Sequence, residues 1–517
     1  GFLLSIASGI GKLAASDTAA ARLNDLVKSY RRRLAAQLAL PIPLRKDVEG
    51  LEQRANAAEK ELARSVAGFG DVLRQVHWQD VQAALRPGEA AVEFVHFQYF
   101  RGLRATDSVL YAALVLRPED NFPRLVPLFE ARQLARLLPE NNDMDRIDAF
   151  YKAPVGLAVY NLVWKPLAAL LKSSKTVYCS PSGLLHRLNL GAIPVSSRQI
   201  IADRHNLVLL GSTRQLATSG DKGKSRGEVR NAALFGGIYY DLDSTIAAPV
   251  PTVDLQRGSE PGSGVPRIEI PALPGMVYLP VFAPTPWGPR PWKYLPSTAF
   301  EVFHIDSLLR ANGYTTRIFT GADAAEEAFQ KIERGSWPAS PRIVHLATHG
   351  YFYPDVSKGQ PINPLTLDGD VSVFQVSEEP MIRSGLILAG ANQTWTTGLP
   401  PAGRADGILT AYEISQLDLS NTELVVLSAC ETGLGVIDGN VGVYGLQRAF
   451  NIAGARYLIM SLWQVNDRKT GELMEVFYRA YLVDGLSVPQ AFRAAQQTMR
   501  ARFPGSPYVW AGFVLVE

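Results

Sequence analysis

The sequence predicts an α/β fold in which helices flank a mostly parallel β-sheet. One observation is a pair of short apolar runs, at 342–348 and 424–429, each of which ends at a reactive side chain in a turn. Apolar runs of this length between turn residues are typical of buried parallel strands. A second observation is that strand-like and helix-like segments alternate along much of the chain, as they do in parallel sheets.

The two apolar runs end at His349 and Cys430. The carboxyl ends of parallel strands meet at one edge of a sheet, and ligands bind there. A thiol beside an imidazole is the minimal machinery of covalent acyl transfer. Cysteine and histidine in apolar runs are more often structural, but here Gly350 follows the histidine and Glu431-Thr-Gly433 follows the cysteine. We therefore expect both side chains at strand tips, outside the packed interior, and Cys430 and His349 to be replaceable without loss of the fold.

Further motifs accompany these two strand ends over most of residues 340–517. Together they make this region resemble the CHAT family of caspase-like cysteine peptidases, which are related to separase. The motifs are Ser-Ala-Cys-Glu-Thr-Gly at 428–433, Ser384–Asn392, Asp406–Ile414, Gly442–Phe450, Ala453–Arg456, Ser461–Asp467 and Tyr508–Phe513.

The resemblance implies a caspase-like sheet and a cysteine endopeptidase. Cys430 would be the nucleophile and His349 the general base and later acid, with no third carboxylate. The backbone N–H groups of Gly350 and Cys430 would hold the oxyanion. His345 lies four residues before His349, and we expect it to be a buried structural residue. The alternative is a catalytically silent caspase-like scaffold that acts as a protein-binding module.

The segment after Trp463 suggests a substrate-binding pocket. Separase, which this region resembles, recognises a basic P1 side chain through acidic residues beyond the equivalent tryptophan. Asp467 is kept here, whereas the further acidic positions fall on Lys469 and Gly471. We predict that Trp463 and Asp467 line a pocket for a basic P1 residue. Asp467 would equally suit the start of the helix expected at 468–483.

The length of 517 residues predicts more than one domain. Two amphipathic helices at 17–40 and 44–66 give a helical arm over residues 1–86, with Ser16 or Asp17 as the N-cap of the first helix. Residues 87–218 are expected to form an N-terminal α/β lobe, similar to a pseudo-caspase. Residues 219–517 are expected to form the caspase-like catalytic lobe, beginning with a polar linker.

A Pro/Gly-rich insertion at 241–296 interrupts the predicted catalytic lobe. Long loops inside compact domains are usually either functional or disordered. Four aromatic residues favour a partly ordered cover, and one hypothesis is a lid over the active site. These residues are Tyr278, Phe282, Trp287 and Trp292.

Composition excludes several classes of protein. A net charge of +3, from 52 basic and 49 acidic residues, gives no reason to expect nucleic acid as a partner. No apolar stretch has the length of a membrane span. The two cysteines, Cys179 and Cys430, exclude a disulfide framework and suit a reducing, cytoplasmic location. Cys179 and His186 lie close in sequence, but a second dyad is rejected because Cys179 falls within a predicted strand.

No metal site is predicted, because the seven histidines and two cysteines are scattered without ligand spacing. No phosphate loop is predicted either, because the glycines between 433 and 442 are interpreted as turn residues around the nucleophile. No cofactor is therefore expected. The expected partners are a protein substrate and either a regulatory protein or an upstream repeat region, with activation by a partner or sensor. Bacterial CHAT proteins of defence systems suggest a role in bacterial defence or cell-death signalling.

Overall fold

The structure is a computed structural model. Cys430, the turn that follows it and most of the insertion lie outside the described residues, as do Ser16, Asp17, Tyr278, Phe282 and Trp287. The described residues are 18–40, 44–65, 76–139, 143–218, 229–242, 291–333, 339–353, 374, 377, 379–428, 442–463 and 467–517.

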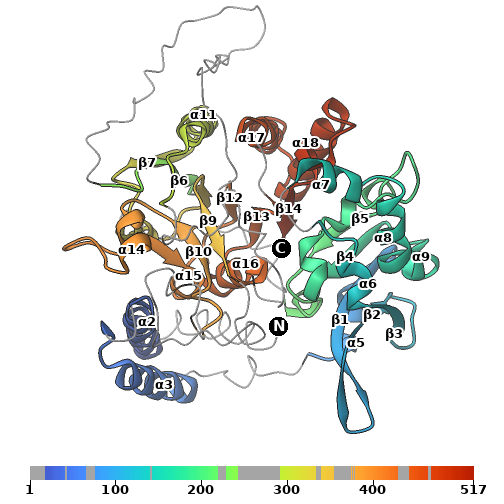
Figure 1. The fold of residues 1–517 in the computed structure, drawn as a ribbon, viewed down its shortest axis with the longest axis horizontal. Coiled ribbons are helices and arrows are strands. Elements are labelled where there is room, and N and C mark those ends of the chain that lie inside the picture. The colour runs from blue at the N-terminus through green and yellow to red at the C-terminus, as the bar shows by residue number, and fades with distance from the viewer. Residues whose placement is uncertain are drawn as a thin grey trace, which may run out of the picture.

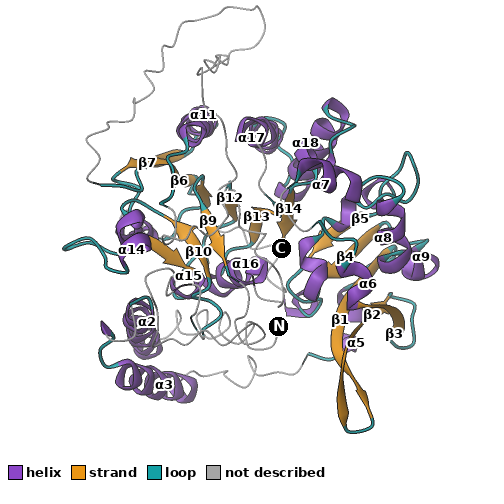
Figure 2. Ribbon diagram, in the orientation of Figure 1, coloured by secondary structure: helices purple, strands orange, loops and turns teal. Residues whose placement is uncertain are grey.

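A large, mostly parallel sheet crosses the whole body of the molecule (Figures 1 and 2), which confirms the predicted fold class. Antiparallel pairs occur at the β3–β2–β1 end and between β13 and β14. In spatial order the strands are β3 (Arg124–Glu130), β2 (Arg104–Leu116), β1 (Glu89–Arg101), β4 (Thr176–Ser180), β5 (Asn206–Leu209), β14 (Phe513–Val516), β13 (Tyr457–Ser461), β12 (Leu424–Leu427), β8 (Ile343–Leu346), β6 (Asn231–Ile238) and β7 (Thr315–Gly321).

Helices cover both faces of the C-terminal half of the sheet. Figure 1 shows α11 (Pro296–Ala311) and α17 (Asp467–Leu482) side by side above the strands and α16 (Gly442–Ala453) below them. The strands β8 and β12 between them are completely buried, as apolar runs without alternation predict. The helix predicted at 468–483 is confirmed as α17, and α18 (Val488–Arg502) follows it.

The apolar residues at 509–516 favour a single strand, but only the second half of this segment is extended. Residues Pro507–Trp510 form a helical turn, α19, and only Phe513–Val516 join the sheet as β14. Proline at the first helical position has its φ already set for a helix and loses no hydrogen bond there. Pro507 therefore starts a turn where the apolar pattern alone suggested an extended chain.

The prediction of parallel strands is wrong at the start of the N-terminal lobe. β1 and β2 pair in antiparallel fashion and β3 continues the meander. The hairpin turns at Gly102, whose φ of 62° suits the first position of a two-residue hairpin turn. Only β4 and β5 then extend the sheet in parallel from β1. The helices of this lobe are α6 (Ala131–Ala135), α7 (Met144–Phe150), α8 (Val155–Val163), α9 (Lys165–Leu171) and α10 (Gln215–Thr218).

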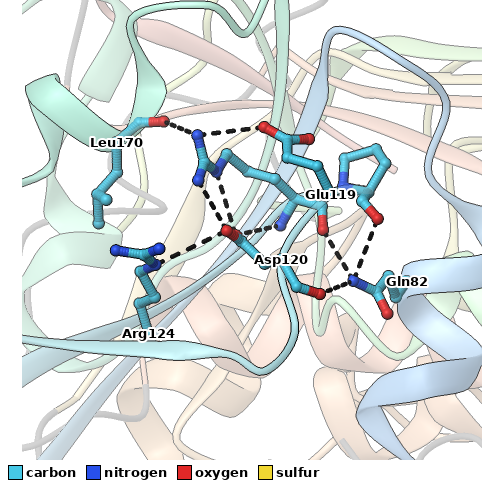
Figure 3. A network of polar contacts seen from close by, with 7 residues as sticks. Gln82, Glu119, Asp120, Arg124 and Leu170 are labelled. Carbon is cyan, nitrogen blue, oxygen red and sulfur yellow. Dashed lines mark hydrogen bonds and ion pairs between the residues drawn. The ribbon is translucent and has the colours of Figure 1, made fainter.

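A polar network attaches α5 (Trp78–Ala84) to the turn between β2 and β3 (Figure 3). The Gln82 side-chain amide donates to the carbonyls of Arg117 and Pro118, at 3.0 and 3.3 Å, and to that of Asp120. The Arg117 guanidinium bonds to the Asp120 carboxylate at 2.7 Å and holds the pKa of that carboxyl below its usual value. α5 thus packs with the α/β lobe, although it falls within the predicted arm; the domain boundaries themselves stay a prediction.

Two helices form the arm, as predicted: α2 (Thr18–Leu38) and α3 (Val48–Ser65) lie side by side. Arg31 joins them through bonds of 2.8 Å to Asn56 and to Glu59. α2 also contacts α15 (Ala411–Ser415), where Arg31 lies near Tyr412 and interacts with it electrostatically. The arm therefore contacts the C-terminal half of the molecule directly. Among the described helices, none is both long and apolar enough to cross a membrane.

A small antiparallel sheet lies beside the large one and carries the chain just after His349. Its order is β11 (Ile408–Thr410), β10 (Ser384–Ile387) and β9 (Gly350–Phe352). Helix α14 (Ala391–Thr397) follows β10. Gly407, just before β11, has a φ of +76°, and a Cβ there would lie 2.7 Å from the backbone nitrogen of Ala391.

Gly407→Ala is expected to destabilise the fold by about 3 kcal/mol or more, because left-handed strain and a backbone clash combine. Gly403→Ala is the matched control: its φ is +72°, but nothing lies within 4 Å of a Cβ at that position. This variant should lower the free energy of unfolding only by the cost of the left-handed backbone conformation, about 1 kcal/mol. Urea unfolding measures both, and equal losses would show that the close approach at Gly407 is unimportant.

Candidate active site

The register of the large sheet brings the ends of two strands together. β8 and β12 are parallel neighbours in which Leu346 lies opposite Leu427. The Ser428 N–H continues the pairing to the Leu346 carbonyl at 2.9 Å. His349 and Cys430 each lie three positions beyond this matched pair. His349 is therefore placed at the expected edge of the sheet, whereas the position of Cys430 stays a prediction because it lies outside the described residues.

The His349 imidazole is buried, with 5% of the residue exposed. Its Nε2 lies 2.8 Å from the backbone carbonyl of Lys293. A carbonyl only accepts, so Nε2 carries the hydrogen, and Nδ1 of the neutral ring is left as an acceptor. Within the described part of the chain nothing hydrogen-bonds to Nδ1. The ring is thus held in one tautomer, with its basic nitrogen available.

Two aromatic rings pack against the imidazole. Trp292 lies 5.0 Å and Tyr240 5.1 Å from it, between ring centroids. The backbone before His349 is held as well, because the Thr348 hydroxyl donates to the Ile387 carbonyl and bonds to the Tyr240 hydroxyl at 3.0 Å. The imidazole therefore has a fixed position and a dry environment. It is part of the packed interior, so the expectation that it stands clear of the core at a strand tip is wrong.

Burial lowers the pKa of His349 to about 4, and the hydrogen bond to the Lys293 carbonyl offsets this only in part. Removing an imidazolium from water is costly, and the described surroundings provide no carboxylate to compensate it. The ring is therefore neutral near pH 7. In this state it suits a proton acceptor and not a standing cation that stabilises a thiolate.

We expect this shift to appear in the pH dependence of any hydrolysis that uses His349 as the base. Protonation removes the base, so kcat/KM should stay level from pH 7 to about 5 and fall with a midpoint near 4. Folding stability changes in the same direction. His349 takes up a proton near pH 6.5 in the unfolded chain and near pH 4 in the folded chain. The free energy of unfolding therefore decreases as pH falls from about 6.5 to about 4. An acid limb centred near 6.5 would contradict the burial of this ring.

His345 is a structural residue, as predicted. It is fully buried, and its Nε2 lies 2.9 Å from Glu301 on α11. Its Nδ1 lies 3.2 Å from the Tyr478 hydroxyl on α17. Both ring nitrogens are used to join the sheet to the two helices that cover it, so His345 is not a second base.

Cys179 is also structural. It lies in β4 with no exposed surface, and its sulfur is 3.9 Å from the Val177 carbonyl. Burial raises the pKa of this thiol well above its usual value, and burial and nearby His96 lower the pKa of His186 to about 4. A protonated, inaccessible thiol is a poor nucleophile, which supports the rejection of a second dyad.

The predicted pocket residue Trp463 is packed between the two halves of the molecule, with 4% exposed. Its Nε1 donates to the Tyr508 carbonyl at 2.9 Å, and its ring lies 5.6 Å from that of Tyr151 in the N-terminal lobe. Asp467 begins α17, but its side chain lies outside the described residues. The pocket formed by these two residues and the oxyanion role of Gly350, which opens β9, stay predictions.

Sequence patterns missed the groups that hold His349. Lys293 contributes a backbone carbonyl, so its side chain gives no indication of the role. The only signal was Trp292, one of four aromatic residues noted in the insertion. The described end of that insertion, residues 291–295, contacts the candidate base directly.

With this geometry in view, comparison with known proteins identifies the class of protein. The CHAT domain family matches residues 153–517, which is most of the chain. The chain therefore belongs to the CHAT domain family, as the sequence motifs indicated.

Two curated relatives are both named Tetratricopeptide repeat protein 28. The protein from Mus musculus is 26% identical over 246 residues, which are 44% of this chain and 9% of that protein. The protein from Homo sapiens is 33% identical over 110 residues, 21% of this chain and 4% of that protein. The matched region is less than a tenth of either relative.

Two solved structures illustrate what the chain is similar to in fold. Gingipain R, an Arg-specific cysteine proteinase, shares 9% identity at a TM-score of 0.34, over 72% of this chain and 67% of that one. Separase, in its complex with securin from Saccharomyces cerevisiae, shares 8% identity at a TM-score of 0.42, over 90% of this chain and 32% of that one.

Proposed function

We propose that the protein is a cysteine endopeptidase with a dyad of Cys430 and His349. The observation that carries this proposal is the state of His349. It is a neutral, buried imidazole with Nε2 bonded to the Lys293 carbonyl, and no residue that the structure describes hydrogen-bonds to Nδ1. It lies at the same offset from the β8–β12 register as the only cysteine besides Cys179. A catalytically silent scaffold has no need of a base held in this form.

The dyad would work in two stages. His349 Nδ1 takes the proton of the Cys430 thiol as its sulfur bonds to the scissile carbonyl carbon, and the N–H groups of Gly350 and Cys430 receive the oxyanion. The C–N bond then breaks, the amine leaves with the proton from His349, and a thioester remains. Water, activated by the same imidazole, hydrolyses the thioester and restores the thiol.

Cleavage of a peptide library tests this proposal. The wild-type chain should cut a restricted set of peptides, and Cys430→Ala should cut none of them. Cys179→Ala is the matched control, because it removes the other thiol from a buried strand. Cleavage that survives in purified Cys430→Ala would overturn the proposal.

The same library tests specificity. We expect cleavage after arginine or lysine, because a carboxylate at Asp467 can pair with a basic P1 side chain. Asp467→Asn should then lower kcat/KM for these peptides by about tenfold or more while the helix beginning there is retained. Cleavage mainly after leucine, methionine or aspartate, unchanged by Asp467→Asn, would rule out the pocket.

We further propose that the arm and the N-terminal lobe form a regulatory platform. The arm reaches α15 through Arg31 and Tyr412. α15 follows β11, which pairs with β10, and β10 pairs with the strand that starts at Gly350. A protein partner or an upstream repeat region, as the names of the curated relatives suggest, would act through this connection. A cytoplasmic enzyme of bacterial defence or cell-death signalling fits this proposal.

A further inference from the structure

A single buried side chain hydrogen-bonds to both the backbone N–H and the backbone carbonyl of Trp292, and we call this pair of bonds the bracket. Asn392, 2% exposed and in the first turn of α14, accepts the Trp292 N–H at 2.7 Å through Oδ1. Its Nδ2 donates to the Trp292 carbonyl at 3.0 Å and to Asp241 Oδ2 at 2.8 Å. Rotating the amide by 180° would place N–H against N–H and oxygen against oxygen. The orientation of the side chain is therefore fixed by its partners.

This bracket acts on the segment that holds His349. Trp292 packs its ring against the imidazole, and the next residue, Lys293, accepts the hydrogen on Nε2. Asn392 is itself anchored, because its backbone N–H donates to the Tyr240 carbonyl at 3.0 Å. Tyr240, at the end of β6, is the other ring against His349. The amide thus joins the end of the insertion to the sheet at the candidate base.

We propose that Asn392 is a positioning residue for His349, which fixes the Nε2–H tautomer through the backbone of Trp292 and Lys293. The inference rests on the proposed function only for its effect on catalysis. A buried amide is costly unless its hydrogen bonds are made. The Asn392 amide uses its acceptor for the Trp292 N–H and its donor for the Trp292 carbonyl, the same two bonds that a neighbouring β-strand would make to that residue. An apolar or acidic side chain of similar size satisfies only part of that set.

The first test is independent of activity and uses the full chain labelled with ¹⁵N-histidine, with the His349→Gln variant to assign the signal. The wild-type ring should be protonated on Nε2, and its pKa should lie well below the ordinary value. Asn392→Ala should release the segment, mix the tautomers and raise the pKa by about one unit or more. A wild-type Nδ1–H tautomer would overturn the proposal whether or not any variant folds.

Two variants separate positioning from packing. Asn392→Asp keeps the shape and the acceptor for the Trp292 N–H but loses both donors and faces Asp241. The tautomer and pKa of His349 should therefore change in this variant as they do in Asn392→Ala, whereas a role in packing alone predicts the wild-type signal. Gln393→Ala is the matched control on the exposed side of the same helix turn, where the wild-type side-chain amide donates to the Pro400 carbonyl at 3.3 Å. An unchanged His349 signal in a folded Asn392→Ala protein would also overturn the proposal.

The second test uses peptide cleavage. Asn392→Ala should lower kcat by about 10- to 100-fold with little change in KM, and should move the acid limb to higher pH. If the wild type cleaves nothing, the proposed function fails while the histidine signals still test the bracket. If Asn392→Ala keeps both the wild-type histidine signal and full activity, the bracket has no positioning role and the peptidase proposal stands.

Discussion

Cys430→Ala and His349→Ala should each lower kcat/KM for peptide cleavage by about a thousandfold or more, to the detection limit. The first variant removes the nucleophile and the second removes the base that takes its proton, so neither residue can act without the other. Because such residues act as a unit, the double variant should be little worse than either single one. The measurement is the rate of cleavage of a peptide selected from the library. Losses that multiply in the double variant would indicate that the residues act separately.

The stability of the histidine variant needs its own control. His349 is packed between Trp292 and Tyr240, and His349→Ala leaves the Lys293 carbonyl without its donor. We expect a loss of about 1–3 kcal/mol in unfolding free energy. His349→Gln retains an N–H donor at this place and should be more stable, yet equally inactive. Activity restored by glutamine would show that the ring is needed for packing and not for proton transfer.

Residues 219–517 expressed alone should fail to fold into the native sheet. β14 pairs with β5, and the Glu517 N–H donates to the Leu209 carbonyl at 2.8 Å. Asn189 donates to the carbonyl of Ala511 at 3.0 Å from the other side of this junction. One continuous cluster of buried side chains fills both halves. Removing the N-terminal half therefore exposes the middle of a core and the edge of β14.

Circular dichroism and thermal unfolding check this prediction. The matched control removes residues 1–75 only, which takes away α2 and α3 but leaves α5 and the whole sheet. It should remain folded, because the arm is attached mainly through its contact with α15. If the chain starting at 219 were soluble, folded and as active as the full protein, the N-terminal lobe would be neither a structural nor a regulatory part of the enzyme.

Residue patterns predicted the strands of the C-terminal half well because burial on both faces produces continuous apolar runs. The runs at 342–348 and 424–429 contain such strands, β8 and β12, which pair in parallel as predicted. The structural role of His345 was predicted for the same reason. By contrast, the β1–β2 hairpin depends on a two-residue turn at Gly102, and strand periodicity does not reveal whether neighbours are parallel.

The support of His349 was beyond the reach of sequence patterns. The carbonyl that fixes its tautomer belongs to Lys293, 56 residues away, and any residue type could provide it. Asn392 lies in a family motif, but its bonds to Trp292 exist only once the end of the insertion reaches the site. The depth of His349 was also misjudged, since a following glycine indicates a turn and not exposure.

Labelling with a peptidyl chloromethyl ketone, ending in arginine or in leucine, decides whether the protein is a cysteine peptidase. Intact-mass spectrometry of the full chain counts adducts, and peptide mapping assigns them to Cys179 or Cys430. We expect one adduct per chain on Cys430, formed much more slowly in His349→Gln, and none on Cys179, which is buried. If neither probe modified Cys430 while iodoacetamide did, or if His349→Gln reacted as fast as the wild type, the dyad would be contradicted.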